Sequence, residues 1–246
     1  DSLKNLLTDL YGGIHPTWDM SQVRPAGARL KTFGGRASGP GPLEAVFKFI
    51  VNTFYKARGR RLTTLECHDI CCVIAQSVIV GGVRRSAMIS LSDLDDQSMA
   101  TAKSGNWWEN HSYRALANNS AVYTEKPSMG KFLQEWTSLY NSFSGERGIL
   151  NRQALESVCN RSARPIPDGC ALGTNPCSEI ILRPLEFCNL STIVIREHDS
   201  KMDIRRKLEM ATILGTVQSK FTYFPYLRKE WKENCEQERL LGVSMT

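Results

Sequence analysis

A thiol, an amide and a carboxylic acid lie close together at residues 175–179 (Asn-Pro-Cys-Ser-Glu), and a second cysteine follows at Cys188. In extended backbone, side chains at i, i+2 and i+4 point to one side, so Asn175, Cys177 and Glu179 would share a surface. A thiol can supply a hydrogen atom or a nucleophile, a carboxylate can move a proton, and an amide can hold a hydroxyl group. The alternative is a turn with a buried cysteine, and the pentapeptide alone favours neither.

Pro176 cannot donate a hydrogen bond to a strand ladder, so the segment is better drawn as a loop tip that leads into a strand over 179–182. The region 171–195 predicts two strands joined around residues 183–185. Such a hairpin would bring Cys177 and Cys188 to neighbouring positions across the strands. Two thiols facing one pocket suit a redox reaction in which sulfur supplies electrons; two core cysteines in a hairpin are the alternative.

Four possible metal ligands, Cys67, His68, Cys71 and Cys72, cluster on a helix predicted over 63–78. Ligands within one helix rarely close a tetrahedral zinc site, and no second pair follows at the spacing of a zinc finger. Apolar neighbours indicate that these cysteines fill the core. We therefore predict no metal site.

Residues 34–42 form a glycine-rich loop that runs into a helix N-terminus, where backbone amides and the helix dipole favour phosphate. Gly34, Gly35, Arg36 and Ser38 are the candidate residues. The loop is neither a Walker loop nor a dinucleotide fingerprint, and a plain loop is the alternative.

Two further segments could contact a substrate. Residues 81–86 (Gly-Gly-Val-Arg-Arg-Ser) place two arginines before a strand, and the glycines allow close backbone approach. Residues 103–119 mix aromatic and basic side chains that could stack on a base. For both segments the alternative is a solvated surface loop.

The composition is that of a globular protein: 246 residues, 41% hydrophobic and 23% charged. No run of eighteen apolar residues predicts a membrane span, and no signal peptide is recognisable. Eight irregularly spaced cysteines indicate a reducing cytoplasm with mostly free thiols. The net charge of +6 favours an anionic partner such as a nucleotide, RNA or DNA, unless the surface is basic without a special partner.

Periodicity predicts alternating helices and strands, and hence the α/β class. Helices are expected from about 43 to Gly59 and over 63–78, 129–142, 147–158, 203–221 and 227–238. Strands are expected over 86–91, 121–123 and 171–195 and from 240 onward, with a polar loop over 102–119. Both ends look cut, as in an internal piece of a longer enzyme.

Five motifs occur in an order that resembles the large catalytic chain of ribonucleotide reductases. They lie at 30–40 (Leu-Lys-Thr-Phe-Gly-Gly-Arg-Ala-Ser-Gly-Pro), 81–87, 118–120 (Asn-Asn-Ser), 145–149 (Gly-Glu-Arg-Gly-Ile) and 175–179 with 188–190. The residues of these motifs and the spacing between them most resemble the monomeric, adenosylcobalamin-dependent ribonucleoside-triphosphate reductases, called class II. The likeness extends over nearly the whole chain.

The resemblance implies part of a ten-stranded α/β barrel with the catalytic cysteine on an inner loop. The whole chain, 1–246, would be one partial catalytic barrel domain, with the effector loop and helix over 1–60 and barrel strands and helices over 61–246. The implied activity is reduction of ribonucleotides to 2′-deoxyribonucleotides for DNA synthesis.

The resemblance also implies residue roles. Cys177 would become a thiyl radical through homolysis of the cobalt–carbon bond of adenosylcobalamin, and would take the 3′ hydrogen atom of the ribose. Glu179 would act as base on the 3′ hydroxyl while the 2′ hydroxyl leaves as water, and Asn175 would hold the hydroxyls. Cys188 would be one of two cysteines that supply electrons and end as a disulfide. A buried loop would protect the radical from water.

Nucleotide contacts follow in the same way. The implied substrate-binding residues are Gly82, Arg84, Ser86 and Asn119. Those for a deoxynucleotide effector are Gly34, Gly35, Arg36 and Ser38, and residues 103–119 would relay effector identity to the substrate. The implied partners are a ribonucleoside triphosphate, a dNTP effector and a thioredoxin-like reductant, with no nucleic acid and no membrane.

Some family parts are expected outside this stretch. The partner of Cys188 would precede Asp1, while a phosphate-binding loop and a re-reducing cysteine pair would follow Thr246, so we expect no turnover by this chain alone. No Asp-x-His-x-x-Gly cobalamin signature is present.

Three alternatives stay open. One is a class I-type ribonucleoside-diphosphate reductase large subunit, whose radical comes from a tyrosyl radical in a partner subunit. Another is a thiol hydrolase using Cys177, which would need a histidine base, although none of the four histidines lies in a motif. The third is a nucleic-acid binding module built on the basic charge and on Trp107 and Trp108.

Overall fold

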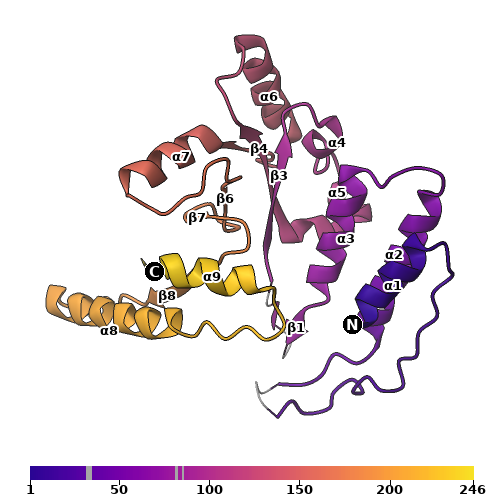
Figure 1. Ribbon diagram of the computed structural model, residues 1–246, viewed down its shortest axis with the longest axis horizontal. Coiled ribbons are helices and arrows are strands. Elements are labelled where there is room, and N and C mark those ends of the chain that lie inside the picture. The colour runs from indigo at the N-terminus through magenta and orange to yellow at the C-terminus, as the bar shows by residue number, and fades with distance from the viewer. Residues whose placement is uncertain (32–34, 81–82, 85) are drawn as a thin grey trace. The chain divides into compact units, whose positions relative to one another are not determined.

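The computed structural model describes residues 1–31, 35–80, 83, 84 and 86–246, with side chains left undescribed over 79–85. The contacts divide the chain into two compact units, Asp1–Leu150 and Asn151–Thr246. Figure 1 draws the first from indigo through magenta and the second from orange to yellow. Each unit is described by itself.

The first unit begins with three helices around an apolar core. They are α1 (Ser2–Tyr11), α2 (Gly41–Lys56) and α3 (Thr64–Gln76), which confirms the helices predicted near 43–58 and 63–78. A proline in the first turn starts α2, and a capping box of Thr63 and Glu66 starts α3. The core gathers Leu6, Val46, Phe47, Ile50, Val51 and Ile70. This core therefore joins residues on both sides of position 60. The predicted division between an effector part (1–60) and a barrel part (61–246) stays a prediction.

The sheet of the first unit has the order β3-β4-β5. Its strands are β3 (Met88–Asp93), β4 (Ala117–Tyr123) and β5 (Gly148–Asn151). Strands β3 and β4 run parallel, with Ser90 opposite Asn119. Before the sheet, β1 (Ile79–Val80) and β2 (Val83–Arg84) form a short antiparallel pair.

The prediction of a polar loop over 102–119 was wrong. That stretch contains α5 (Trp107–Asn110), the 3₁₀ helix η1 (Ser112–Leu116) and the start of β4, and α4 (Gln97–Ala100) precedes it. The buried Arg114 explains why this stretch is structured. Its guanidinium donates to Asp69 of α3 at 2.7 and 2.6 Å and to the Ala102 carbonyl at 2.7 Å. These bonds fix the segment against α3.

Helix α6 (Met129–Ser142) has the predicted bounds, but the helix predicted over 147–158 starts later than expected. Strand β5 occupies its first residues, and α7 (Arg152–Arg161) begins only after Asn151, whose side chain accepts from the Ala154 amide. Residues 148–151 form a strand because of Arg147, which is 2% exposed. It pairs with Glu135 of α6 and donates to the Asp93 and Leu94 carbonyls, so the chain beside it is held against the sheet.

The second unit combines a short hairpin with a βαβ arrangement. The hairpin strands are β6 (Gly173–Thr174) and β7 (Ile181–Leu182). Next come β8 (Asn189–Ile193), α8 (Lys201–Ser219), α9 (Lys229–Glu238) and β9 (Leu241–Met245). Strands β8 and β9 are parallel neighbours, with Ser191 opposite Val243. Two parallel pairs with intervening helices confirm the α/β class, and the ten-stranded barrel stays a prediction.

Among the residues described, no helix has both the length and the apolar character needed to cross a membrane.

Candidate active site

The segment that carries Cys177 is the tip of a tight hairpin. Strands β6 and β7 are antiparallel, with Gly173 opposite Leu182. The Asn175 amide donates to the Ile180 carbonyl at 3.2 Å, and the Ile180 amide donates to Asn175 Oδ1 at 3.0 Å. The side chain of Asn175 therefore closes the loop and is itself fixed at its base.

Two expectations about this hairpin were wrong. The loop is not extended, because residues 176–178 turn and Ser178 has a φ of 67°. The strands are also not joined around 183–185. The hairpin closes over 175–180, and the chain after Cys188 enters β8, which pairs with β9. Cys177 and Cys188 are therefore not cross-strand neighbours.

The reactive groups of the loop are open to solvent. Cys177 and Glu179 are exposed, and Asn175 is half-buried, so in this chain the loop does not have the buried, inner position that the resemblance implies. Since Cys177 lies at the tip of the hairpin, its thiol can be approached by a large molecule, whereas the strands behind it restrict the backbone. The predicted loop tip leading into a strand near 179–182 is confirmed, since β7 begins at Ile181.

Cys188 lies in the electrostatic field of the same loop. Burial raises the pKa of its thiol to about 11, and the carboxylates of Glu179 and Glu186 add to the rise. At neutral pH the sulfur therefore keeps its proton. The influence of Glu179 on this thiol shows that the structure brings these two predicted site residues into one neighbourhood.

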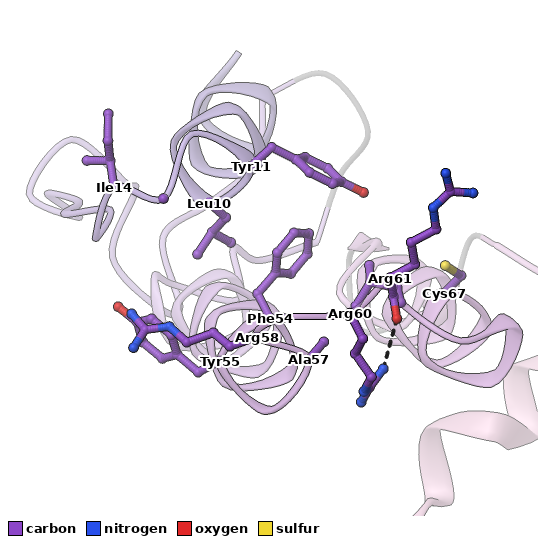
Figure 2. Close-up of a pocket in the computed structure, with 13 residues that line it drawn as sticks. Leu10, Tyr11, Ile14, Phe54, Tyr55, Ala57, Arg58, Arg60, Arg61 and Cys67 are labelled. Atoms are coloured by element: carbon purple, nitrogen blue, oxygen red, sulfur yellow. Dashed lines mark hydrogen bonds between the residues drawn. The ribbon is translucent and has the colours of Figure 1, made fainter.

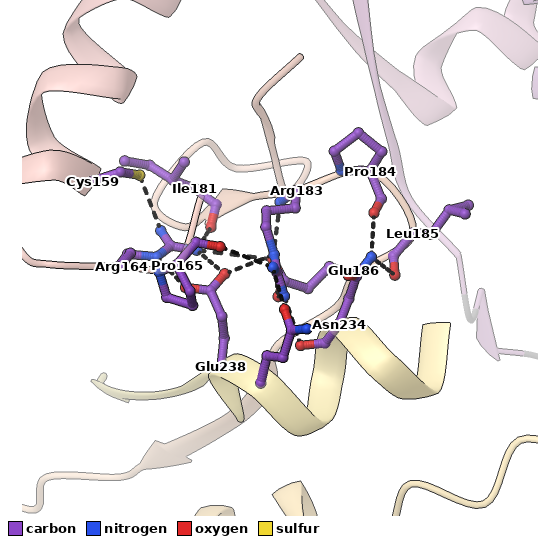
Figure 3. A network of polar contacts seen from close by, with 11 residues as sticks. Cys159, Arg164, Pro165, Ile181, Arg183, Pro184, Leu185, Glu186, Asn234 and Glu238 are labelled. Carbon is purple, nitrogen blue, oxygen red and sulfur yellow. Dashed lines mark hydrogen bonds and ion pairs between the residues drawn. The ribbon is translucent and has the colours of Figure 1, made fainter. Parts of the chain in front are cut away.

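A buried charge network anchors the hairpin (Figure 3). Arg164 donates to both oxygens of Glu238 at 2.7 and 2.8 Å and to the carbonyl of Ile181 in β7 at 3.1 Å. Arg183, which follows β7, donates to Glu186 at 3.2 and 3.3 Å and lies 3.2 Å from Glu238. The network ties β7 to α9 and to the segment after α7.

The pKa values of the two acids in the network shift in opposite directions. Burial and the nearby Glu238 raise the pKa of Glu186. Burial also opposes ionisation of Glu238, but hydrogen bonds from Arg164 and Glu186 outweigh it and lower the pKa of Glu238. The two buried carboxyl groups therefore respond in opposite directions to the same network, because Glu238 receives the shorter arginine hydrogen bonds. Sequence reasoning missed this network, and its only signal was Arg183 and Glu186 at i and i+3 across a turn.

The predicted substrate-binding residues all belong to the first unit. Gly82 lies outside the described residues, and the backbone of Arg84 is part of β2. Ser86 donates to the Ala75 carbonyl of α3 at 2.7 Å. Asn119 is 3% exposed, and its Oδ1 lies 3.2 Å from Nε2 of His68. Their contact with a substrate stays a prediction.

The described part of the predicted effector loop lies next to a cavity. Gly34 lies outside the described residues. The Leu30 amide donates to the Gly35 carbonyl at 3.0 Å, and Arg36 donates to the Gly27 carbonyl at 2.9 Å. Arg24, Arg36 and Ser38 line a cavity of about 360 Å³ at the start of α2. Two arginines at a helix N-terminus are suited to an anion.

The cysteine cluster on α3 divides between surface and core. Cys67 and Cys71 are exposed, whereas Cys72 is buried 3.7 Å from His68 Nε2. Burial and the Asp69 carboxylate raise the pKa of Cys72 to about 12, so it remains a thiol. Within the described part of the chain, no three His, Cys, Asp or Glu side chains are placed to hold a metal ion.

Comparison with known proteins agrees with the motif order. No family model matches the chain. The chain is 31% identical over 232 residues to the adenosylcobalamin-dependent ribonucleoside-triphosphate reductase of Lactobacillus delbrueckii subsp. bulgaricus. The aligned region covers 93% of this chain and 30% of that protein. The chain is homologous to part of these reductases. The reductase of Lacticaseibacillus paracasei is 32% identical over 236 residues, with the same coverage.

A solved structure gives the same result for the fold of this chain. The crystal structure of a B-12 dependent (class II) ribonucleotide reductase matches with a TM-score of 0.68 and 26% sequence identity. The match covers 93% of this chain and 30% of that one. The resemblance inferred from the motifs is confirmed, and the chain spans 30% of the length of these relatives.

Proposed function

We propose that the protein containing this chain reduces ribonucleoside triphosphates to 2′-deoxyribonucleotides through a thiyl radical at Cys177. The observation that carries the proposal is the hairpin: an exposed thiol at its tip, closed by the Asn175 side chain, with Glu179 acting on a second thiol at Cys188. Similarity to adenosylcobalamin-dependent ribonucleoside-triphosphate reductases supports it.

Each residue has a defined part in the proposed reaction. The Cys177 thiyl takes the 3′ hydrogen atom of the ribose, and Glu179 accepts the proton of the 3′ hydroxyl as the 2′ hydroxyl leaves as water. Once the 2′ carbon is reduced, Cys177 returns the hydrogen atom to the 3′ carbon and Glu179 returns the proton. Cys188 and a second thiol supply two electrons and two protons and become a disulfide. The raised pKa of Cys188 suits this role, because the proton that must be delivered is already on the sulfur.

The cofactor in this proposal is adenosylcobalamin, which appears in the names of the relatives. When bound, it supplies the radical that removes the hydrogen atom from the Cys177 thiol. The position of Cys177 fits such a bulky group, because an exposed thiol at a hairpin tip can be approached from the solvent side. Asn175 and the β6–β7 ladder keep the sulfur in place meanwhile.

The proposal includes three nucleotide or protein partners. A ribonucleoside triphosphate is the substrate, a dNTP effector binds at the cavity lined by Arg36 and Ser38, and a thioredoxin-like dithiol restores the cysteines. All eight cysteines are free, which suits a reducing cytoplasm as the site of deoxynucleotide synthesis.

A thiol hydrolase is less well supported by the geometry. The only histidine of the second unit is His198, which is exposed in the loop before α8. The buried pair of Cys72 and His68 has the wrong electrostatics, since the raised pKa of Cys72 disfavours the thiolate that a nucleophile requires. A class I-type diphosphate reductase differs mainly in the radical source, and the test below separates it.

The test compares the reductase with its flanking sequence restored, as wild type and as Cys177→Ser, with and without adenosylcobalamin. We expect cobalamin-dependent loss of the 2′ hydroxyl in the wild type and a fall of at least ~10³-fold in the variant, because a serine hydroxyl cannot replace the thiol that carries the hydrogen atom. Cys71→Ser removes another exposed thiol and should leave the rate unchanged.

Either of two results would contradict the proposal. Turnover that survives Cys177→Ser would remove the radical from this sulfur. Turnover that needs no cobalamin but requires a radical-bearing partner subunit would instead favour the class I-type reductase.

A further inference from the structure

A cavity of about 610 Å³ lies where α1, α2 and the start of α3 meet, and Figure 2 shows its lining. Its size falls within the range of small-molecule sites, ~300–1,000 Å³. None of the residues predicted for the effector loop, the substrate or the Cys177 hairpin lines it. It is therefore distinct from the sites described above.

Aromatic rings form one side of the cavity. The rings of Tyr11 and Phe54 meet edge to face, with centroids 5.1 Å apart, and Tyr55 also lines the space. Ala57 is buried among the lining residues. Tyr11 is 75% exposed, so most of its ring is not covered by other residues and remains accessible to a planar ligand.

Arginines form the polar side. Arg58, Arg60 and Arg61 line the cavity, and no acidic residue does. Arg60 is occupied, because its guanidinium donates to both oxygens of Glu66 at 2.7 Å. The other two arginines are exposed, and neither makes an ion pair within the described part of the chain.

Arg58 is already oriented. Its guanidinium lies 4.5 Å from the centre of the Tyr55 ring, a contact that limits its freedom without neutralising its charge. In Figure 2, Arg61 lies at the opposite edge of the cavity from Arg58, and its side chain extends in another direction from that of Arg60. A guanidinium group without a carboxylate partner, next to open aromatic rings, is the chemistry that recognises a phosphate joined to a planar base.

We propose that this cavity binds a nucleoside phosphate, with the base against Tyr11 and Phe54 and the phosphates on Arg61. The inference rests on the lining of the cavity and does not require the chemistry of Cys177. It gives the chain a second nucleotide site, separate from the loop that carries Arg36.

The experiment measures ATP binding to the 246-residue chain by equilibrium dialysis, with adenosine and inorganic triphosphate as the two halves of the probe. Labelling with 8-azido-ATP and peptide mapping then locates the base. We expect ATP to bind more tightly than either half, and the label to lie in peptides containing residues 10–14 or 54–62. Arg61→Gln and Tyr11→Ala should each weaken ATP binding by ~10-fold or more, since stacking and charge-assisted bonds are lost.

Matched controls change residues of the same types on the second unit. Arg206→Gln and Tyr226→Ala alter an exposed arginine and a tyrosine that is 95% exposed, and ATP affinity should not change. Because Tyr11 and Arg61 are also exposed, their variants should keep the circular dichroism spectrum of the wild type.

Three results would overturn the inference. One is no ATP binding by the wild type at 1 mM, roughly the weak limit of specific association. Another is binding of inorganic triphosphate as tight as that of ATP, which would leave no role for the rings of Tyr11 and Phe54. The third is loss of ATP binding in Arg36→Ala with no loss in Arg61→Gln, which would place the nucleotide at the effector loop and leave the proposed function standing.

Discussion

Replacing Arg183 by methionine should destabilise the second unit more than any surface substitution. The side chain is 2% exposed and makes an ion pair with Glu186, whose side chain is fully buried. It also donates to the Pro165 carbonyl at 3.1 Å, the Gln237 side chain at 2.8 Å and the Asn234 carbonyl at 2.8 Å. Methionine fills much of the same volume but satisfies none of these acceptors.

The expected loss of unfolding free energy at pH 7 is about 3–5 kcal/mol, the usual cost of removing one partner of a buried ion pair. That is a large part of the ~5–15 kcal/mol that stabilises a domain. The loss arises because Glu186 and Glu238 remain buried together with only Arg164 for compensation.

The loss should depend on pH. Burial and Glu238 already raise the pKa of Glu186, and removing Arg183 raises it further. A group with a raised folded-state pKa contributes stability that is full below its unfolded value and is lost as pH rises through the folded value. The variant should therefore differ less from the wild type at pH 5 than at pH 8.

Urea unfolding provides the measurement, followed by circular dichroism and by the fluorescence of Trp231, whose ring lies 5.7 Å from Phe187. The control is Arg205→Met, which breaks an exposed pair with Glu209 and should cost only about 0.3–0.5 kcal/mol. A loss below ~1 kcal/mol for Arg183→Met, or an equal loss at pH 5 and pH 8, would refute the reasoning.

Two further predictions concern the second unit. Glu179→Gln should lower the pKa of Cys188 from about 11, because it removes a negative charge that opposes the thiolate, so iodoacetamide should label Cys188 faster at pH 8–9. Peptide mass spectrometry gives the rate, and an unchanged rate would show that the carboxylate does not act on this thiol. Ser200→Ala removes the capping box that starts α8 and should lower the unfolding free energy by about 1 kcal/mol in urea, and no shift of the midpoint would contradict the cap.

The helices were the part of the fold that sequence periodicity predicted well. Helices α2, α6, α8 and α9 lie close to their expected bounds, because their patterns and caps are local. The strand β5 and the 3₁₀ helix η1 were missed for one reason. Each is held by a buried arginine, Arg147 or Arg114, whose acidic partner is far away in the sequence.

At the candidate site, too, the sequence predicted local features but not the pairing of distant strands. The turn expected at Pro184 exists, since Leu185 has a φ of 57°, but the strand that follows it pairs with β9 and not with β7. A pattern of apolar residues does not reveal which distant strand is the partner. The residue types at 175–179 were nevertheless sufficient to find the exposed thiol, because that inference used chemistry and not pairing.

The charge network links the stability of the hairpin to the chemistry proposed for it. Glu186 acts on both, since its burial holds Arg183 in place and its carboxyl group raises the pKa of Cys188. Arg164 opposes that rise while it holds the β7 backbone at Ile181. A substitution chosen to loosen the hairpin would therefore also change how readily Cys188 loses its proton. For this reason a fall in activity of an Arg164 variant should be interpreted only beside the measured pKa of Cys188, because a loose hairpin and an altered thiol would each slow the same reaction.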